Sequence, residues 1–217
     1  MLTELNADIG TRGITVIVGK SGCGKTTLLR LIAGLEQPTS GSIVIPSGSR
    51  VGMVFQEARL MPWLTVERNV AFGVRGRKNP EHIRALIALV GLDGFAKAYP
   101  SQLSGGMQQR VALARALATD SEIILMDEPF AALDYFTRRQ MQTELIRIQR
   151  ESGRAILMVT HNLDEALTLG DSLVVLSGGR ISRKFDLSDQ CAQRDLLSPA
   201  FIDIKRQILT EMEGESL

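Results

Sequence analysis

A short β-branched run leads directly into a glycine-rich loop near the start of the chain. The pattern predicts a buried strand over Ile14–Val18 and a loop over Gly19-Lys20-Ser21-Gly22-Cys23-Gly24-Lys25-Thr26. Residues 25–33 then have a helical pattern, with Gly34 as the stop. A strand that enters a helix through such a loop is the opening unit of a parallel α/β sheet, and no other feature constrains the fold as strongly.

Apolar runs and helical patterns alternate along the rest of the chain. This alternation predicts an α/β fold with a largely parallel sheet core and some antiparallel elements. The predicted strands are 42–45, 51–55, 122–126 and 155–159, the first two antiparallel around Pro46-Ser47-Gly48. A hairpin of 173–176 and 180–185 turns at Ser177-Gly178-Gly179, and helices are predicted over 135–150 and 199–212.

The stretch from Thr65 to Thr119 contains no convincing strand pattern. Asn79 followed by Pro80 is a typical helix start, and Ser104 is a plausible N-cap for a helix that ends at Ala118. We interpret this stretch as an inserted α-helical subdomain. The predicted organisation is one domain over residues 1–217, with a core of 1–64 and 120–198, a helical subdomain at about 65–119 and a C-terminal helix at about 199–213.

Composition narrows the class of protein further. The chain has 217 residues, of which 44% are hydrophobic, and a net charge of +1, so nothing favours a nucleic-acid partner. Its two cysteines, Cys23 and Cys191, are far apart, which argues against a disulfide framework and favours a reducing cytoplasm. The start of the chain has no signal-peptide pattern, and no apolar run approaches the roughly 20 residues that cross a bilayer. Work at a membrane would require another chain to hold this one there.

The glycine loop has the composition of a phosphate cradle. Glycines let backbone N–H groups approach phosphate oxygens, and the following helix directs its positive end at the same place. Lys25 would contact the β- and γ-phosphates, the Thr26 hydroxyl would bind Mg²⁺, and Thr27 would support the loop.

A second chemical element is the acidic end of the strand predicted over 122–126. Asp127 is placed to hold Mg²⁺ through water, and Glu128 follows it at once. Glu128 could therefore orient or deprotonate an attacking water.

These residues, together with Leu103-Ser104-Gly105-Gly106-Met107-Gln108, resemble the ATP-binding cassette (ABC) transporter ATPases over nearly the whole chain. The resemblance implies a P-loop NTPase (RecA-like) core, with Gly19 to Thr26 as the Walker A loop and Asp127 as the end of Walker B. It assigns Glu128 as the catalytic glutamate. It also implies ATP and Mg²⁺ as cofactors.

Four further elements of this family match positions in the chain. Gln56 corresponds to the Q-loop glutamine, which senses Mg²⁺ and the attacking water, and His161 to the switch histidine that bonds the γ-phosphate. Ser104, Gly105 and Gly106 correspond to the signature that caps the γ-phosphate of the opposite subunit. Asp134 ends Ala132-Leu133-Asp134, the D-loop that crosses the dimer interface. The family resemblance therefore implies a head-to-tail homodimer.

The segment from Val54 to Val70 looks like that of the nitrate, sulfonate and taurine importers, as does Tyr99-Pro100-Ser101-Gln102 before the signature. That resemblance implies an ATPase on the cytoplasmic side of the inner membrane. It also implies a separate permease and, indirectly, a solute-binding protein. Leu60, Met61, Pro62 and Trp63 become candidate permease contacts, although Trp63 could equally pack within the subdomain.

The chain departs from the family pattern near its beginning. The family usually stacks adenine on an aromatic residue upstream of Walker A, whereas the first aromatic residue here is Phe55. We therefore expect weaker ATP affinity and poorer discrimination against GTP than in a relative with that residue, unless an upstream segment is missing.

The alternatives to an importer subunit are a soluble ABC ATPase of DNA repair or translation and a non-catalytic nucleotide-binding regulator; an exporter is least favoured.

Overall fold

The computed structural model describes residues 2–10, 12–74, 79–188 and 195–213. Internal contacts divide the chain into two units. The terminal unit comprises Met1–Ile45 and Gln149–Leu217, and the central unit comprises Pro46–Ile148. Four residues of the predicted helical insertion, 75–78, lie outside the described part, as does the segment 189–194 with Cys191.

The sheet of the terminal unit is built around β1 (Ile14–Val18). β1 pairs in parallel with β4 (Ala155–Thr160) on one side and with β5 (Ser172–Ser177) on the other. β6 (Arg180–Asp186) completes the order β4-β1-β5-β6 as an antiparallel partner of β5. Every residue of β1 and β4 is buried, which explains why these strands are apolar throughout.

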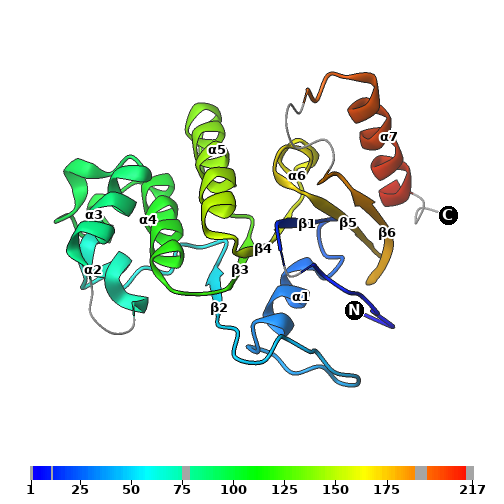
Figure 1. Cartoon of the computed structure of the whole chain (residues 1–217), viewed down its shortest axis with the longest axis horizontal. Helices are drawn as coiled ribbons and strands as arrows, with labels where there is room; N and C mark the ends of the chain where they lie inside the picture. The colour runs from blue at the N-terminus through cyan, green and yellow to red at the C-terminus, as the bar shows by residue number, and fades with distance from the viewer. Residues whose placement is uncertain (1, 11, 75–78, 189–194, 214–217) are drawn as a thin grey trace. The chain divides into compact units, whose positions relative to one another are not determined.

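Three helices pack on this sheet. α1 (Lys25–Ile32) contacts β4, α6 (Leu163–Leu169) contacts β1 and β4, and α7 (Pro199–Glu213) lies along β5 (Figure 1). Phe201 and Ile208, two turns apart on α7, are both buried. The Glu211 carboxylate accepts a hydrogen bond of 2.7 Å from Ser182 on β6. The amphipathic C-terminal helix predicted from the sequence is thus confirmed, with packing on the body of the terminal unit.

The central unit joins a parallel strand pair to a group of helices. β2 (Val51–Val54) pairs with β3 (Ile123–Asp127). The helices are α2 (Val66–Val70), α3 (Pro80–Leu89), α4 (Gly105–Ala118) and α5 (Tyr135–Ser152), with short 3-10 turns at Ala71–Gly73, Asp93–Phe95 and Pro100–Gln102. α4 contacts α2, α3 and β2, and it is the element around which this unit packs. α5 runs past Ile148, so its last turn belongs to the terminal unit.

Helix starts in the central unit follow the predicted capping chemistry. The Asn79 side chain accepts hydrogen bonds from the backbone N–H groups of Glu81 and His82, and Pro80 is the first residue of α3. Ser104 caps α4 in the same way, accepting from the Met107 N–H at 3.3 Å. The described residues between Thr65 and Thr119 contain no strand, as predicted.

The predicted strand at 42–45 is wrong. These residues form no strand, and Val44 is 88% exposed. The segment lies between Gly41 and Gly48, both with positive φ, and β2 begins only at Val51. High β-propensity does not make a strand without a partner to complete its hydrogen bonds. The other predicted strands and helices are present, with ends that differ by about one or two residues.

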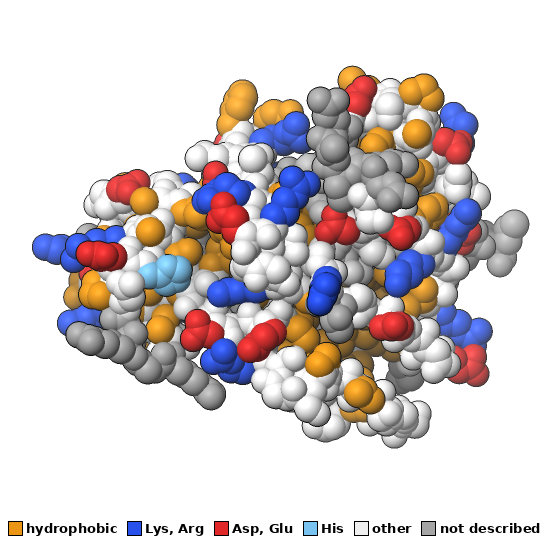
Figure 2. All heavy atoms as spheres, in the orientation of Figure 1, with side chains coloured by type: hydrophobic (Ala, Val, Ile, Leu, Met, Phe, Trp, Pro, Cys, Tyr) orange, Lys and Arg blue, Asp and Glu red, His pale blue; other side chains and the backbone are white. Residues whose placement is uncertain are grey.

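The surface carries both signs of charge in close mixture. Figure 2 shows Lys and Arg side chains interspersed with Asp and Glu over the visible face, in keeping with the net charge of +1. Within the described ranges, no helix combines the length and the apolar character that crossing a bilayer requires.

Candidate functional site

The glycine loop of the terminal unit wraps around its own lysine. Lys25 is 7% exposed, and its Nζ donates to the carbonyl oxygens of Gly19 at 2.8 Å and Lys20 at 2.9 Å. The Cys23 N–H closes the loop on the Lys20 carbonyl at 3.3 Å. A lysine held in this way can transfer its hydrogen bonds from carbonyl to phosphate oxygens with little movement.

The glycines of this loop have two different roles. Gly22 has φ +83°, which favours glycine, and an added Cβ would meet no atom within 4 Å, so the space beside this residue is open. Gly19 is buried, and a Cβ there would overlap the Leu176 carbonyl oxygen. Gly24, the N-cap of α1, supplies no side-chain cap to the helix start. The loop and helix start therefore fit a phosphate group.

The other predicted residues of the loop differ in their exposure to solvent. Lys20, Ser21 and Thr27 are exposed, whereas Cys23 and Thr26 are half-buried.

His161 lies at the same edge of the sheet as the glycine loop. Val18 and Thr160 are paired partners in the parallel strands β1 and β4, so Gly19 and His161 are the next residues along their strands. Thr160 is fixed by a 2.9 Å hydrogen bond from its hydroxyl to the buried Glu165 carboxylate. Asn162 caps α6 by accepting from the Glu165 N–H at 3.2 Å. His161 is thus an exposed side chain between two anchored neighbours.

The acidic strand end belongs to the central unit. Asp127 is the last residue of β3 and is 4% exposed. Glu128 is half-buried and has φ +45°, the left-handed region that residues other than glycine rarely occupy. Such backbone strain is found preferentially at functional sites. The turn is closed by the Ala131 N–H on the Glu128 carbonyl at 3.2 Å and is anchored by the fully buried Phe130.

Gln56 follows β2 at the edge where Asp127 ends β3. Val54 and Met126 are paired partners in these parallel strands, so both chains leave the sheet on the same side. The Gln56 side chain is exposed. The structure therefore brings the predicted Q-loop glutamine and the two predicted carboxylates to one edge of the central unit.

The signature residues form the amino-terminal end of α4. Ser104 accepts a hydrogen bond from the helix, which leaves its hydroxyl proton available to donate. Gly105 is exposed, and an added Cβ would meet no atom within 4 Å. A Cβ on Gly106, in contrast, would lie 3.1 Å from the Ala132 carbonyl oxygen. Gly106 is small so that the helix can approach the Ala132–Asp134 turn, whereas Gly105 keeps the helix end open.

Asp134 is exposed and directly precedes α5. Its carboxylate accepts from the Thr137 N–H at 3.1 Å. Hydrogen bonds from the side chain and then the backbone of Thr137 hold the pKa of Asp134 below its ordinary value. The residue therefore carries its charge at neutral pH.

The candidate permease contacts stand on a firmly held loop. Leu60 and Met61 are half-buried, Pro62 is exposed, and Trp63 is 70% exposed. Asn69, which is completely buried, accepts from the Met61 N–H at 2.8 Å and donates to the Leu64 carbonyl at 2.9 Å. Sequence reasoning missed Asn69, because a side chain that bonds only backbone groups belongs to no motif.

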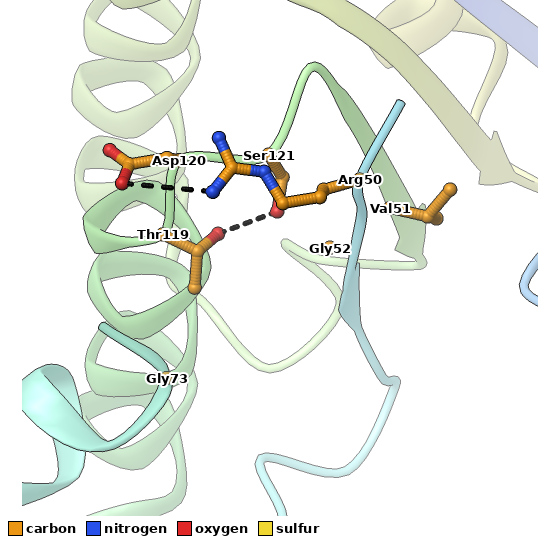
Figure 3. Close-up of a pocket in the computed structure, with 7 residues that line it drawn as sticks. All are labelled: Arg50, Val51, Gly52, Gly73, Thr119, Asp120 and Ser121. Atoms are coloured by element: carbon orange, nitrogen blue, oxygen red, sulfur yellow. Dashed lines mark hydrogen bonds and ion pairs between the residues drawn. The ribbon is translucent and has the colours of Figure 1, made fainter. Parts of the chain in front are cut away.

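A hollow of about 300 Å³ occupies the opposite edge of the central unit. Figure 3 shows Arg50, which precedes β2, beside Asp120 and Ser121, which precede β3. The Arg50 guanidinium lies 3.9 Å from the Asp120 carboxylate, and the Thr119 and Ser121 hydroxyls are 2.8 Å apart. Because parallel strands begin at this edge and the candidate residues follow their other ends, the hollow is separate from the candidate site.

No three His, Cys, Asp or Glu side chains come together as a metal-binding group within the described part of the chain. A magnesium site completed by phosphate oxygens and one or two protein oxygens needs no such group. Thr26 in the terminal unit and Asp127 in the central unit each supply an oxygen of the type that Mg²⁺ prefers, so each residue taken by itself suits a magnesium–nucleotide complex.

The predicted site residues thus fall into two groups. The glycine loop and His161 share one edge of the terminal unit. Gln56, Ser104–Gly106, Asp127, Glu128 and Asp134 all belong to the central unit.

Residues 2–131, more than half of the chain, match the family described as ABC transporter. The chain is 44% identical over 214 residues to an aliphatic sulfonates import ATP-binding protein of Pseudomonas syringae, with 98% of this chain and 91% of the relative covered. It is 41% identical over 228 residues to a taurine import ATP-binding protein of Pelagibacter ubique, with 96% of this chain and 86% of the relative covered.

The fold also matches a solved dimeric structure of an ATP-binding cassette in a post-hydrolysis state, bound to ADP and phosphate. The TM-score is 0.78 at 33% identity, over 86% of this chain and 90% of that one. Together with the glycine loop, the helix start at Ser104 and the acidic end of β3, these likenesses establish that the chain belongs to the ABC transporter family.

Proposed function

We propose that the chain is the ATP-hydrolysing subunit of an ABC importer. The observation that carries the proposal is the conformation of Glu128, a carboxylate fixed by a left-handed backbone directly after the buried Asp127. The sequence likeness to ATP-binding proteins of sulfonate and taurine importers supports the same conclusion.

In this proposal, backbone N–H groups of residues 19–24 and the start of α1 bind the phosphates of ATP, and Lys25 transfers its hydrogen bonds from the loop carbonyls to the β- and γ-phosphates. Thr26 and Asp127 would hold Mg²⁺, which would supply neutralising charge to the phosphate oxygens. Glu128 orients or deprotonates the attacking water, and Gln56 and His161 contact the γ-phosphate region.

The signature is proposed to act on a second copy of the chain. The open helix start at Ser104 and Gly105 presents a hydroxyl, backbone donors and the positive helix end to an anion. In a head-to-tail dimer this surface would cover the nucleotide held by the partner's glycine loop, with Asp134 near the interface. Solved structures of similar cassettes are dimeric, which supports a dimer of this chain.

The transported solute is proposed to be a small sulfonate, taurine or nitrate-like anion. It would pass through a separate permease supplied by a solute-binding protein, with this subunit on the cytoplasmic side of the inner membrane. Leu60, Met61, Pro62 and Trp63 are the proposed permease contacts. The 70% exposure of Trp63 supports this role over packing within the unit.

The test is a comparison of the purified chain with its Glu128→Gln variant. The wild-type chain should hydrolyse ATP in the presence of Mg²⁺. The variant should bind ATP, lose at least about 100-fold in turnover and accumulate as an ATP-dependent dimer in gel filtration with light scattering. Undiminished turnover by Glu128→Gln would contradict the assignment of Glu128, and absence of ATP binding by both proteins would contradict the function itself.

A further inference from the structure

Helix α4 holds residues 55–59, the segment called the Q-loop, through two side chains that bond only backbone carbonyls. The Gln109 side chain, 3% exposed, donates from Nε2 to the Phe55 carbonyl at 3.0 Å. The Arg115 guanidinium donates from Nη1 to the Arg59 carbonyl and from Nη2 to the Ala58 carbonyl, both at 2.8 Å. The two ends of the segment that contains Gln56 are therefore tied to the same helix.

The Q-loop is also closed by a contact between its own two ends. Arg59 has φ +44°, and its guanidinium lies 4.1 Å from the centre of the Phe55 ring, a cation–π contact that joins the ends of the turn. Trp63 follows four residues later. A displacement of Arg115 would therefore move both the turn that contains Gln56 and the loop that contains Trp63. Both continue directly from residues 58 and 59, whose carbonyls Arg115 binds.

The opposite end of α4 carries Ser104 and Gly105. Ten residues separate Gly105 from Arg115, or about 15 Å along one helix. The helix is continuous from Gly105 to Ala118. A rigid rod of this kind transmits a movement at its amino-terminal end to its far end without an intervening hinge.

We propose that Arg115 is a positioning residue that couples capture of a nucleotide at the start of α4 to the Q-loop and the loop that bears Trp63. The inference rests on the proposed function, because it takes Ser104 and Gly105 as the surface that meets a partner's nucleotide. Arg115 does not touch ATP; it acts by holding the carbonyls of residues 58 and 59 to the helix.

The same helix offers a matched comparison in Arg110. Arg110 also donates to two consecutive carbonyls, those of Val90 at 2.7 Å and Gly91 at 3.2 Å, but these lie at the end of α3 and not in the Q-loop. Burial lowers the pKa of Arg110 and of Arg115, with Asp134 opposing the effect at Arg110. Replacing either arginine by lysine keeps the charge and removes the planar fork.

Trp63 reports directly on the proposed coupling, because it is the only tryptophan in the sequence. The full chain with Glu128→Gln, which binds ATP without turnover, serves as the parent. ATP should shift the Trp63 emission maximum and change its quenching by acrylamide. Adding Arg115→Lys should abolish this response while ATP binding, measured by calorimetry, remains; adding Arg110→Lys should leave the response intact.

Three results would overturn the proposal while the proposed function stands. One is an ATP-dependent Trp63 response that survives in both Arg115→Lys and Arg115→Ala. Another is a parent that binds ATP with no response at Trp63. Equal loss in the Arg110→Lys variant would also overturn it, since the effect would then be one of general stability. A parent that fails to bind ATP would defeat the proposed function and, with it, the coupling.

Discussion

Gly105→Ala separates the function of the signature glycine from its contribution to folding. The added methyl group would meet no atom within 4 Å. Alanine is better than glycine in a helix interior by about 0.5–1 kcal/mol, which is an upper limit for Gly105 at the first position of α4, so the variant should be no less stable than the wild type. For a chain of this size, that gain corresponds to a rise in melting temperature of up to about 4 °C.

The same methyl group occupies the space through which a phosphate would approach the start of α4. It would separate the backbone donors from a partner's γ-phosphate, and the loss of one such donor commonly costs about 100-fold or more in turnover. The variant should therefore release phosphate more slowly at steady state, while its melting temperature stays unchanged or rises.

The matched control is Gly94→Ala. Gly94 is also exposed, and a Cβ there likewise meets no atom within 4 Å, but it lies in the 3-10 turn Asp93–Phe95, away from the signature. It should leave hydrolysis unchanged. Hydrolysis of ATP by Gly105→Ala at the wild-type rate would refute this role of Gly105, as would a loss of activity matched by a loss of stability.

Three further predictions concern stability and pH. Asn69→Ala should lower the free energy of unfolding by about 1–3 kcal/mol in urea titrations, because buried backbone groups lose their partner; an unchanged midpoint would contradict this. Gly19→Ala should lower melting temperature and ATP binding together, since its Cβ overlaps the Leu176 carbonyl; a stable variant that cannot bind ATP would assign Gly19 to the ligand alone. Because hydrogen bonds depress the pKa of Asp134, its contribution to stability should be present at neutral pH and lost as the pH falls through that lowered pKa; acid melting curves of Asp134→Ala should lack this loss.

The parts of the fold that sequence predicted well are those whose signals are local. The run Ile14–Val18 is a buried strand because β-branched residues and a following glycine loop specify both its conformation and its end. Asn79 and Ser104 start helices because their side chains satisfy nearby N–H groups.

The failures lie where a residue depends on a distant partner. Residues 42–45 have the propensity of a strand but no strand beside them. The division at Ile148, inside α5, breaks no local pattern and was not predicted. Arg115 and Asn69 bond backbone carbonyls, which every residue possesses, so no sequence spacing reveals the pairing.

The central claim, that each catalytic site combines one chain's glycine loop with the signature of another, is tested by mixing two inactive variants. Lys25→Ala removes the phosphate lysine, and Gly105→Asp places a carboxylate where the signature meets phosphate. Each variant alone should be inactive. An equimolar mixture should regain about a quarter of the wild-type ATPase activity, because half of the dimers are mixed and each mixed dimer has one intact site. Activity in either variant alone, or none in a mixture that demonstrably forms mixed dimers, would contradict the account.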